Sequence, residues 1–200
     1  MSKIILQPAG SPVSQEHYND TIVNPVNLDN IARFLDNETL RKLKNTYNGN
    51  DSFIWGVTPG HNNINRTKWM RIQVGDVCLF YREGHLFSSG KVIHTLRNAD
   101  LARHLWREDD YGYTWEYIYF LDEINQPNIP IRKFNKIAGY QENFIVQGFN
   151  VLTEDKSDRI INSFNLDNYE EELIENAVQD ENLTEDSPNK YGGGGESEAH

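Results

Sequence analysis

The sequence lacks a cysteine pair, a long apolar run and a secretory signal. Its single cysteine, Cys78, lies in the apolar run VCLF, which excludes an intrachain disulfide and a cysteine-ligated metal site and indicates a small buried side chain. No stretch approaches the roughly 18 apolar residues of a transmembrane helix. The N-terminus, MSKIILQPAGSP, has too short an apolar run for a secretory signal. These absences predict a cytoplasmic protein with no membrane contact.

The motifs of common catalytic and cofactor sites are also missing. The sequence contains no GxGxxG or GxxxxGK phosphate loop and no HExxH metal motif. Its histidines fall in separate predicted elements, and the acidic run Glu108, Asp109 and Asp110 is typical of a solvated loop. We therefore predict a binding module with no catalytic residue, no cofactor and no metal ion.

Negative charge is concentrated at the C-terminal end. The chain has a net charge of −11, yet residues 1–164 hold 18 Lys and Arg against 19 Asp and Glu. Residues 165–200 hold one Lys against 11 Asp and Glu. Residues 60–107 reverse the sign, with eight Lys and Arg against three Asp and Glu. This basic segment is compatible with polyanion binding, although charge alone favours an ordinary solvated surface.

The patterning predicts an α+β domain with a curved mixed sheet or partial β-barrel surrounded by short helices. Residues 1–50 are expected to form an irregular leader over residues 1–27 and then two short helices that pack on the core, and residues 51–164 to hold the strands of the core. The aromatic run YTWEYIYFLDEI predicts a strand, and FIVQGFNVL indicates another. Gly75 and Asp76 predict a turn before a further strand, and residues 99–106 predict a short helix. Residues 165–178 predict an acidic helix, and residues 179–200 a disordered, acidic and glycine-rich linker.

Tryptophans are concentrated in the middle of the chain. Trp55, Trp69, Trp106 and Trp115 all fall within one 61-residue span. Flat aromatic faces can stack on a flipped or single-stranded base, contributing about 1 to 3 kcal/mol per base. The alternative interpretation is packing in the core, where tryptophan is also common.

Several segments together resemble the EVE domain of the PUA-like superfamily, which is related to YTH domains. They are FIWGVTPG, KWMRIQVGDVCLFY, LFSSGKVI, YTWEYIYFLDEI and FIVQGFNVLTEDKSDRI, and they span roughly residues 51–164. The resemblance implies a barrel-like core with helices around it and an aromatic cage for one modified nucleobase. It implies that Trp55 and Trp106 form this cage, with Trp115 as a third candidate and Trp69 as packing or rim.

Polar and basic side chains around the expected cage complete the predicted site. Discrimination beyond a methyl group requires polar groups that the wrong base leaves unpaired. The candidates for reading the base are Asn62, Asn63, Ser88, Ser89 and Gln147. The candidates for phosphate binding are Arg66, Lys68, Arg71, Arg82 and Arg97.

We expect Trp55 and Trp106 to be partly exposed in the free protein and Trp115 to behave more like a core residue. The predicted function is a reader that flips a methylated or hydroxymethylated base out of double-stranded DNA. The leader and the segment GGGGESEAH resemble parts of restriction-type proteins. They indicate a specificity module that works with a downstream nuclease domain or subunit. The alternatives are an RNA reader of the same fold, an enzyme acting on nucleotides, and a protein-interaction domain that uses the acidic tail.

Overall fold

The computed structural model describes residues 1–167, of which residues 1–164 form one compact unit. The strands are β1 (Ile4–Pro8), β2 (Val26–Asn27), β3 (Asp51–Val57), β4 (Val77–Arg82), β5 (His85–Arg97), β6 (Tyr117–Asn125), β7 (Ile129–Pro130) and β8 (Asn150–Val151). The α-helices are α1 (Pro12–Tyr18), α2 (Leu28–Ile31), α3 (Asn37–Tyr47), α4 (Ile64–Trp69), α5 (Ala99–Trp106), α6 (Ile131–Ala138) and α7 (Glu154–Phe164). Shorter helical turns are η1 (Asn19–Val23), η2 (Ala32–Phe34) and η3 (His61–Asn63).

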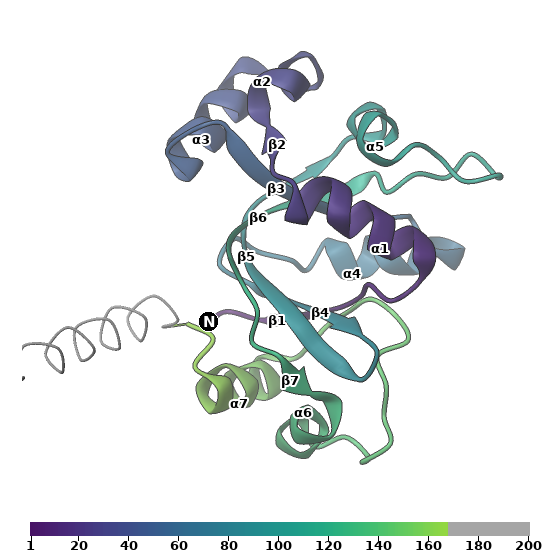
Figure 1. The fold of residues 1–200 in the computed structure, drawn as a ribbon, viewed down its shortest axis with the longest axis vertical. Helices are drawn as coiled ribbons and strands as arrows, with labels where there is room; N and C mark the ends of the chain where they lie inside the picture. The colour runs from purple at the N-terminus through teal and green to yellow at the C-terminus, as the bar shows by residue number, and fades with distance from the viewer. Residues whose placement is uncertain (168–200) are drawn as a thin grey trace, which may run out of the picture. The chain divides into compact units, whose positions relative to one another are not determined.

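The strands form one curved, mixed sheet with helices around it (Figure 1). Their order is β2-β3-β6-β5-β4-β1-β8, and β7 pairs with β5. Among the described residues β1 and β4 pair in parallel, whereas the other pairs are antiparallel. The α+β fold with a curved mixed sheet surrounded by short helices, predicted from the sequence, is confirmed.

The expectation of an irregular leader over residues 1–27 is wrong. Residues Ile4–Pro8 form β1, which lies between β4 and β8, with Ile4 and Ile5 fully buried. Helix α1 follows, with Ser11 as its N-cap and Pro12 in its first turn. Pro8 therefore ends a strand, Pro12 starts a helix and Pro25 directly precedes β2, and the leader belongs to the core.

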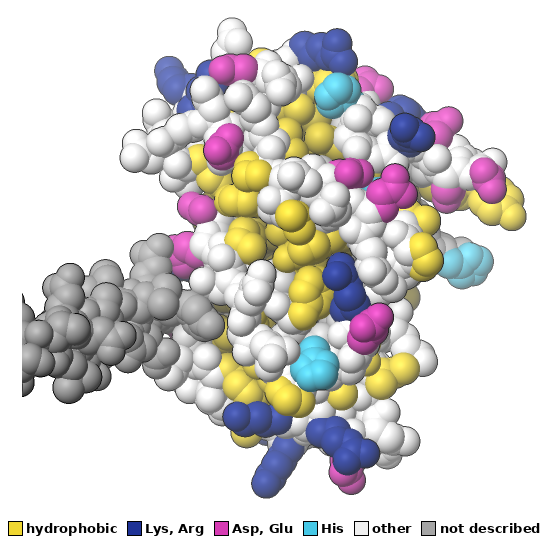
Figure 2. All heavy atoms as spheres, in the orientation of Figure 1, with side chains coloured by type: hydrophobic (Ala, Val, Ile, Leu, Met, Phe, Trp, Pro, Cys, Tyr) yellow, Lys and Arg dark blue, Asp and Glu magenta, His cyan; other side chains and the backbone are white. Residues whose placement is uncertain are grey.

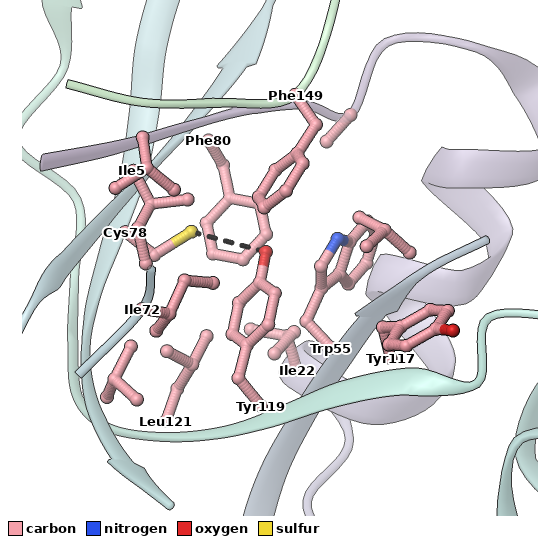
Figure 3. Close-up of a cluster of buried hydrophobic side chains, with 14 of the residues drawn as sticks. Ile5, Ile22, Trp55, Ile72, Cys78, Phe80, Tyr117, Tyr119, Leu121 and Phe149 are labelled. Carbon is pink, nitrogen blue, oxygen red and sulfur yellow. Dashed lines mark hydrogen bonds between the residues drawn. The ribbon is translucent and has the colours of Figure 1, made fainter. Parts of the chain in front are cut away.

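Both faces of the sheet are covered, and strand alternation decides which side chain faces which core. Along β3, Ile54 packs with Leu28 of α2 and Leu101 of α5, whereas Trp55 packs on the opposite face. That opposite core contains Phe80 and Tyr119, and Figure 3 shows Trp55 beside them. Helix α1 and η1 close this core from outside the sheet, because Tyr18 and Ile22 belong to it.

Two predicted strands are shorter than expected. The aromatic strand begins at Tyr117, so Trp115 lies in the irregular segment before it. Of FIVQGFNVL only Asn150 and Val151 pair, and residues 141–149 form a loop that is largely exposed. Asn135 holds this loop, since its Nδ2 donates to the carbonyl oxygens of Glu142 and Phe144. Both irregular segments border the cavities described below.

The predictions for the C-terminal segment, residues 165–200, can be compared with the structure only as far as residue 167. The acidic helix and the linker lie almost entirely in residues 168–200, outside the described residues. Within residues 1–167 no helix is long and apolar enough to cross a membrane.

Candidate nucleic-acid interface

Four adjoining cavities surround the C-terminal end of β3. The amide cavity, of about 270 Å³, is lined by Gln7, Ser14, Thr58, Asn65, Trp115 and Gln147 among others. The aromatic cavity, of about 290 Å³, is lined by His17, Thr58, Trp106, Glu108, Tyr113 and Trp115 among others. The loop cavity, of about 430 Å³, is lined by Leu6, Lys68 and residues 143–150. The outer cavity, of about 280 Å³, is lined by Thr58, Gly60, His61, Asp109 and Tyr113.

Shared side chains join these cavities into one groove. Thr58 and Trp115 border both the amide and the aromatic cavity. Residues 147–149 border both the amide and the loop cavity. Thr58 and Tyr113 also connect the aromatic cavity to the outer one. The groove therefore runs along the irregular segments 107–116 and 143–150, with Trp115 near its middle.

Trp115 is partly buried and rests on other aromatic rings. Its ring centroid lies 4.2 Å from that of His17, 4.9 Å from that of Trp55 and 5.6 Å from that of Trp106. The indole packs against these rings and also lines the amide and the aromatic cavity. Trp115 is thus held in place as a flat apolar wall.

The expected exposure of Trp55 and Trp106 is wrong. Trp55 has no exposed surface and Trp106 is 5% exposed, whereas Trp115 is the partly exposed member of the three. A base held between two rings needs them about 7 Å apart, twice the usual 3.5 Å contact. Trp106 and Trp115 are 5.6 Å apart and tilted by 46°, so a base does not fit between them in this conformation. The structure supplies one accessible wall instead of an open cage.

Sequence position explains this reversal. Trp55 lies inside β3, where alternation points its side chain into the core against Phe80, at 5.2 Å between ring centroids. Trp106 ends α5 on the same buried side as Leu101 and Ala102, and its Nε1 lies 3.3 Å from Thr21 Oγ1. Trp115 belongs to no strand and is partly exposed at the groove.

The close fit of Trp115 and Trp106 on β3 depends on Gly56. A Cβ atom added at Gly56 would lie 2.5 Å from the Trp115 carbonyl oxygen and 3.1 Å from a ring atom of Trp106. Gly56→Ala is therefore expected to lower the free energy of unfolding by about 1 to 3 kcal/mol, measured by urea denaturation. Gly10→Ala is the control, because its Cβ would meet nothing closer than 3.9 Å and should change stability little. Equal stability of both variants would contradict this packing.

The aromatic cavity has an acidic rim. Glu108, Asp109 and Asp110 line it, and Figure 2 shows acidic side chains over the loop that follows α5. Asp109 also holds the loop in shape, because its Oδ1 accepts hydrogen bonds from the backbone N–H groups of Tyr111 and Tyr113. Arg107 lines the same cavity, so three carboxylates stand against one cation and the rim is unfavourable for phosphate.

His17 lines the inner end of the aromatic cavity. It is 8% exposed, and its Nδ1 is buried without a hydrogen-bond partner in the described part of the chain. Burial lowers the pKa of His17, against the opposing effects of Asp20 and Glu16. The ring is therefore neutral at pH 7 and serves as support for Trp115.

The predicted phosphate-binding residues have different surroundings. Arg66 and Arg71 are exposed on and just after α4, and neither forms an ion pair within residues 1–167. Lys68 ties α4 to the groove, because its Nζ donates to the carbonyl oxygen of Phe149 at 2.8 Å. Arg82 donates to the Ala9 carbonyl oxygen and lies over the Phe87 ring, and Arg97 pairs with Glu116 at 2.9 Å. Of these five predicted residues, Arg66 and Arg71 are thus the two that have no ion pair within residues 1–167 and leave their guanidinium groups free.

Of the predicted base-reading residues, some line the groove and others do not. Gln147 is exposed and lines both the amide and the loop cavity. Asn62 and Asn63 are exposed in the turn before α4 but do not line the cavities. Ser88 and Ser89 are buried in β5, and Ser88 accepts a hydrogen bond from the Tyr18 hydroxyl. The structure therefore brings Gln147 to Trp115 but leaves the other four outside the groove.

Three polar groove residues of the first 20 positions were missed. They are Gln7 of β1 and Ser14 and His17 of α1. The signals that could have found these elements are the apolar run IIL and the Ser-Pro pair, which is typical of a helix start. Within residues 1–167 no group of three or more His, Cys, Asp or Glu is placed to hold a metal ion.

Comparison with known proteins gives a match in structure. No protein-family model matches the chain, and no curated protein matches its sequence. Among solved structures it is similar to the N-terminal domain of Thermococcus gammatolerans McrB bound to m5C DNA, with a TM-score of 0.60 and 12% identity. The match covers 82% of this chain and 98% of that chain. At this identity the likeness shows a shared fold, which spans almost the whole of the McrB domain.

Proposed function

We propose that this chain is a DNA-binding module that reads a modified base in the groove beside Trp115. The observation that carries the proposal is a supported, partly exposed indole next to a cavity lined by amide and hydroxyl groups. The fold likeness to a McrB domain bound to m5C DNA supports the same function. Membership of the EVE family, and a role as specificity module for a nuclease domain or subunit, are part of this proposal.

The chemistry of the groove suits a flipped base. Moving a base out of a duplex costs a few kcal/mol, which stacking and hydrogen bonds to the base edge offset. Trp115 offers stacking of about 1 to 3 kcal/mol. A methyl group adds about 0.8 kcal/mol of apolar contact, which corresponds to a three- to fourfold preference. Base reading by stacking therefore needs one well-held indole and does not require a two-walled cage.

Charge favours the amide cavity over the aromatic one. Asn65 of α4 lines the amide cavity, and the exposed Arg66 follows it directly. The aromatic cavity is bordered by three carboxylates, Glu108, Asp109 and Asp110, against one cation, Arg107. Because phosphates flank every flipped base, the backbone is expected to lie on the α4 side.

The direct test is a binding measurement on matched oligonucleotides. Fluorescence anisotropy is recorded with a DNA duplex containing one 5-methylcytosine, the same duplex with cytosine, and the corresponding RNA. We expect tightest binding to the methylated DNA. Equal binding of methylated and unmethylated duplexes would contradict modified-base reading for this probe, and tightest binding to RNA would favour the RNA reader.

Salt dependence tests the role of the α4 side separately. The logarithm of the binding constant is expected to fall linearly with the logarithm of salt concentration, by about 0.9 per contacted phosphate. Arg66→Ala and Arg71→Ala should each lower this slope by about 1. Arg41→Ala, an exposed arginine of α3 outside the groove, is the matched control and should leave the slope unchanged. If none of these variants changes the slope of the salt dependence, the DNA phosphates do not contact Arg66 or Arg71.

A further inference from the structure

Gln7 is a buried polar side chain at the amide cavity. It lies in β1, is 6% exposed and is one of the residues that line this cavity together with Trp115. Strand alternation places it on the same face as Ile5 and Ala9, which belong to the core that contains Tyr119. A buried amide here needs defined hydrogen-bond partners.

The partners of Gln7 determine which way its amide points. Its Nε2 lies 3.0 Å from the Pro8 carbonyl oxygen, which can only accept a hydrogen bond. The group facing Pro8 must therefore be the NH₂ group. The amide oxygen Oε1 then faces the Tyr119 hydroxyl at 2.7 Å, so Tyr119 donates to it.

Tyr119 is itself fixed in the core. Its side chain is fully buried, and its hydroxyl oxygen lies 3.8 Å from Cys78 Sγ, the contact drawn as a dashed line in Figure 3. Burial raises the pKa of the Tyr119 hydroxyl and of the Cys78 thiol, so both keep their protons at neutral pH. The Tyr119 hydroxyl donates to Oε1 and the Pro8 carbonyl oxygen accepts from Nε2, and together they hold the amide of Gln7 in one orientation.

One N–H group of Gln7 is left over. An amide NH₂ carries two donors, and the hydrogen bond to Pro8 uses one of them. The second has no partner within residues 1–167. We propose that this N–H donates a hydrogen bond to an acceptor atom of the base stacked on Trp115, and that Tyr119 is the positioning residue that aims it. The inference rests on the proposed function, because it needs a base in the amide cavity.

The arrangement gives a physical basis for selecting among bases. Cytosine and its 5-methyl derivative carry two ring-plane acceptors, N3 and O2. A buried donor left unpaired by the wrong base costs far more than a missing methyl group. Loss of this hydrogen bond is therefore expected to weaken binding about 5- to 150-fold.

The test is a double-mutant cycle in which the Gln7 side chain and one acceptor atom of the base are changed separately and together. Binding of wild type and Gln7→Met is measured with three DNA duplexes, which carry 5-methylcytosine, its analogue with C–H in place of N3, and its analogue without O2. Wild type is expected to lose about 5- to 150-fold in affinity with one analogue. Gln7→Met should bind the 5-methylcytosine duplex with similarly reduced affinity and show no further loss with that analogue.

Further variants separate binding from folding. Gln7→Glu keeps the acceptor for Tyr119 but removes the donor, so it should lose affinity like Gln7→Met. Tyr119→Phe removes one of the two hydrogen bonds that hold the amide, so the amide is aimed less firmly and the discrimination between 5-methylcytosine and the sensitive analogue should fall. Gln73→Met, an exposed glutamine outside the groove, is the control for binding, and thermal melts verify that each variant is folded.

The outcomes distinguish the two proposals. Wild type that prefers methylated DNA, together with folded Gln7 variants that keep wild-type affinity for every duplex, would overturn the role of Gln7 alone. The role of Gln7 would also be overturned if each analogue reduced the affinity of wild type and of Gln7→Met by the same factor. No preference of wild type for methylated DNA would overturn both the inference and the proposed function.

Discussion

Trp55→Ala is expected to lower the free energy of unfolding by about 3 to 5 kcal/mol, the usual cost of removing a large buried aromatic side chain. Trp55 has no exposed surface and contacts Tyr18, Phe80 and Trp115, with ring centroids at 6.1, 5.2 and 4.9 Å. Its replacement leaves a cavity at the centre of the core, which the surrounding strands fill only in part. Urea denaturation measures this loss directly.

Trp55→Phe is the control for this effect. Phenylalanine keeps an apolar ring and removes the indole Nε1, which is buried without a hydrogen-bond partner in the described part of the chain. We therefore expect a clearly smaller loss of stability than for alanine. A Trp55→Ala variant as stable as wild type, with reduced DNA binding, would instead make Trp55 a wall of the site, as the resemblance to EVE domains implied.

The sequence predicted the fold where patterns are local and strong. The turn at Gly75 and Asp76 precedes β4, and residues 99–106 form α5 with the predicted bounds. These segments carry their apolar periodicity and caps within a few residues. The prediction for the leader failed because prolines and a glycine around the five-residue strand conceal it, and because its partners in β4 are 73 positions away, as in the pair Ile4 and Val77.

Exposure was harder to predict than position. Aromatic content indicated that the tryptophans matter, and the structure does bring Trp55, Trp106 and Trp115 together. Which of them faces solvent depends on where β6 starts and on the side to which β3 turns Trp55, and both depend on tertiary pairing. The amide of Gln7 was not found at all, because its orientation comes from Tyr119, which is 112 positions away in the sequence.

Trp115→Ala is expected to weaken binding to a duplex containing 5-methylcytosine by about 1 to 3 kcal/mol, the range of one base–aromatic stack. That range corresponds to an affinity loss of about 5- to 150-fold. The expected cost in stability is smaller than for Trp55→Ala, since Trp115 is only partly buried at the border of two cavities. Anisotropy titrations at a temperature well below the melting point of the variant separate the two effects.

Trp69→Ala provides the matched control for Trp115→Ala. Trp69 is also partly buried, donates from its Nε1 to the Ile118 carbonyl oxygen at 3.1 Å, and packs on Tyr117 with ring centroids 5.2 Å apart. It does not line the groove, so its removal should cost stability and leave the affinity of the folded protein unchanged. If the two variants lose affinity equally, or if folded Trp115→Ala binds like wild type, then the base does not stack on Trp115. In that case the groove at the end of β3 is not the reading site.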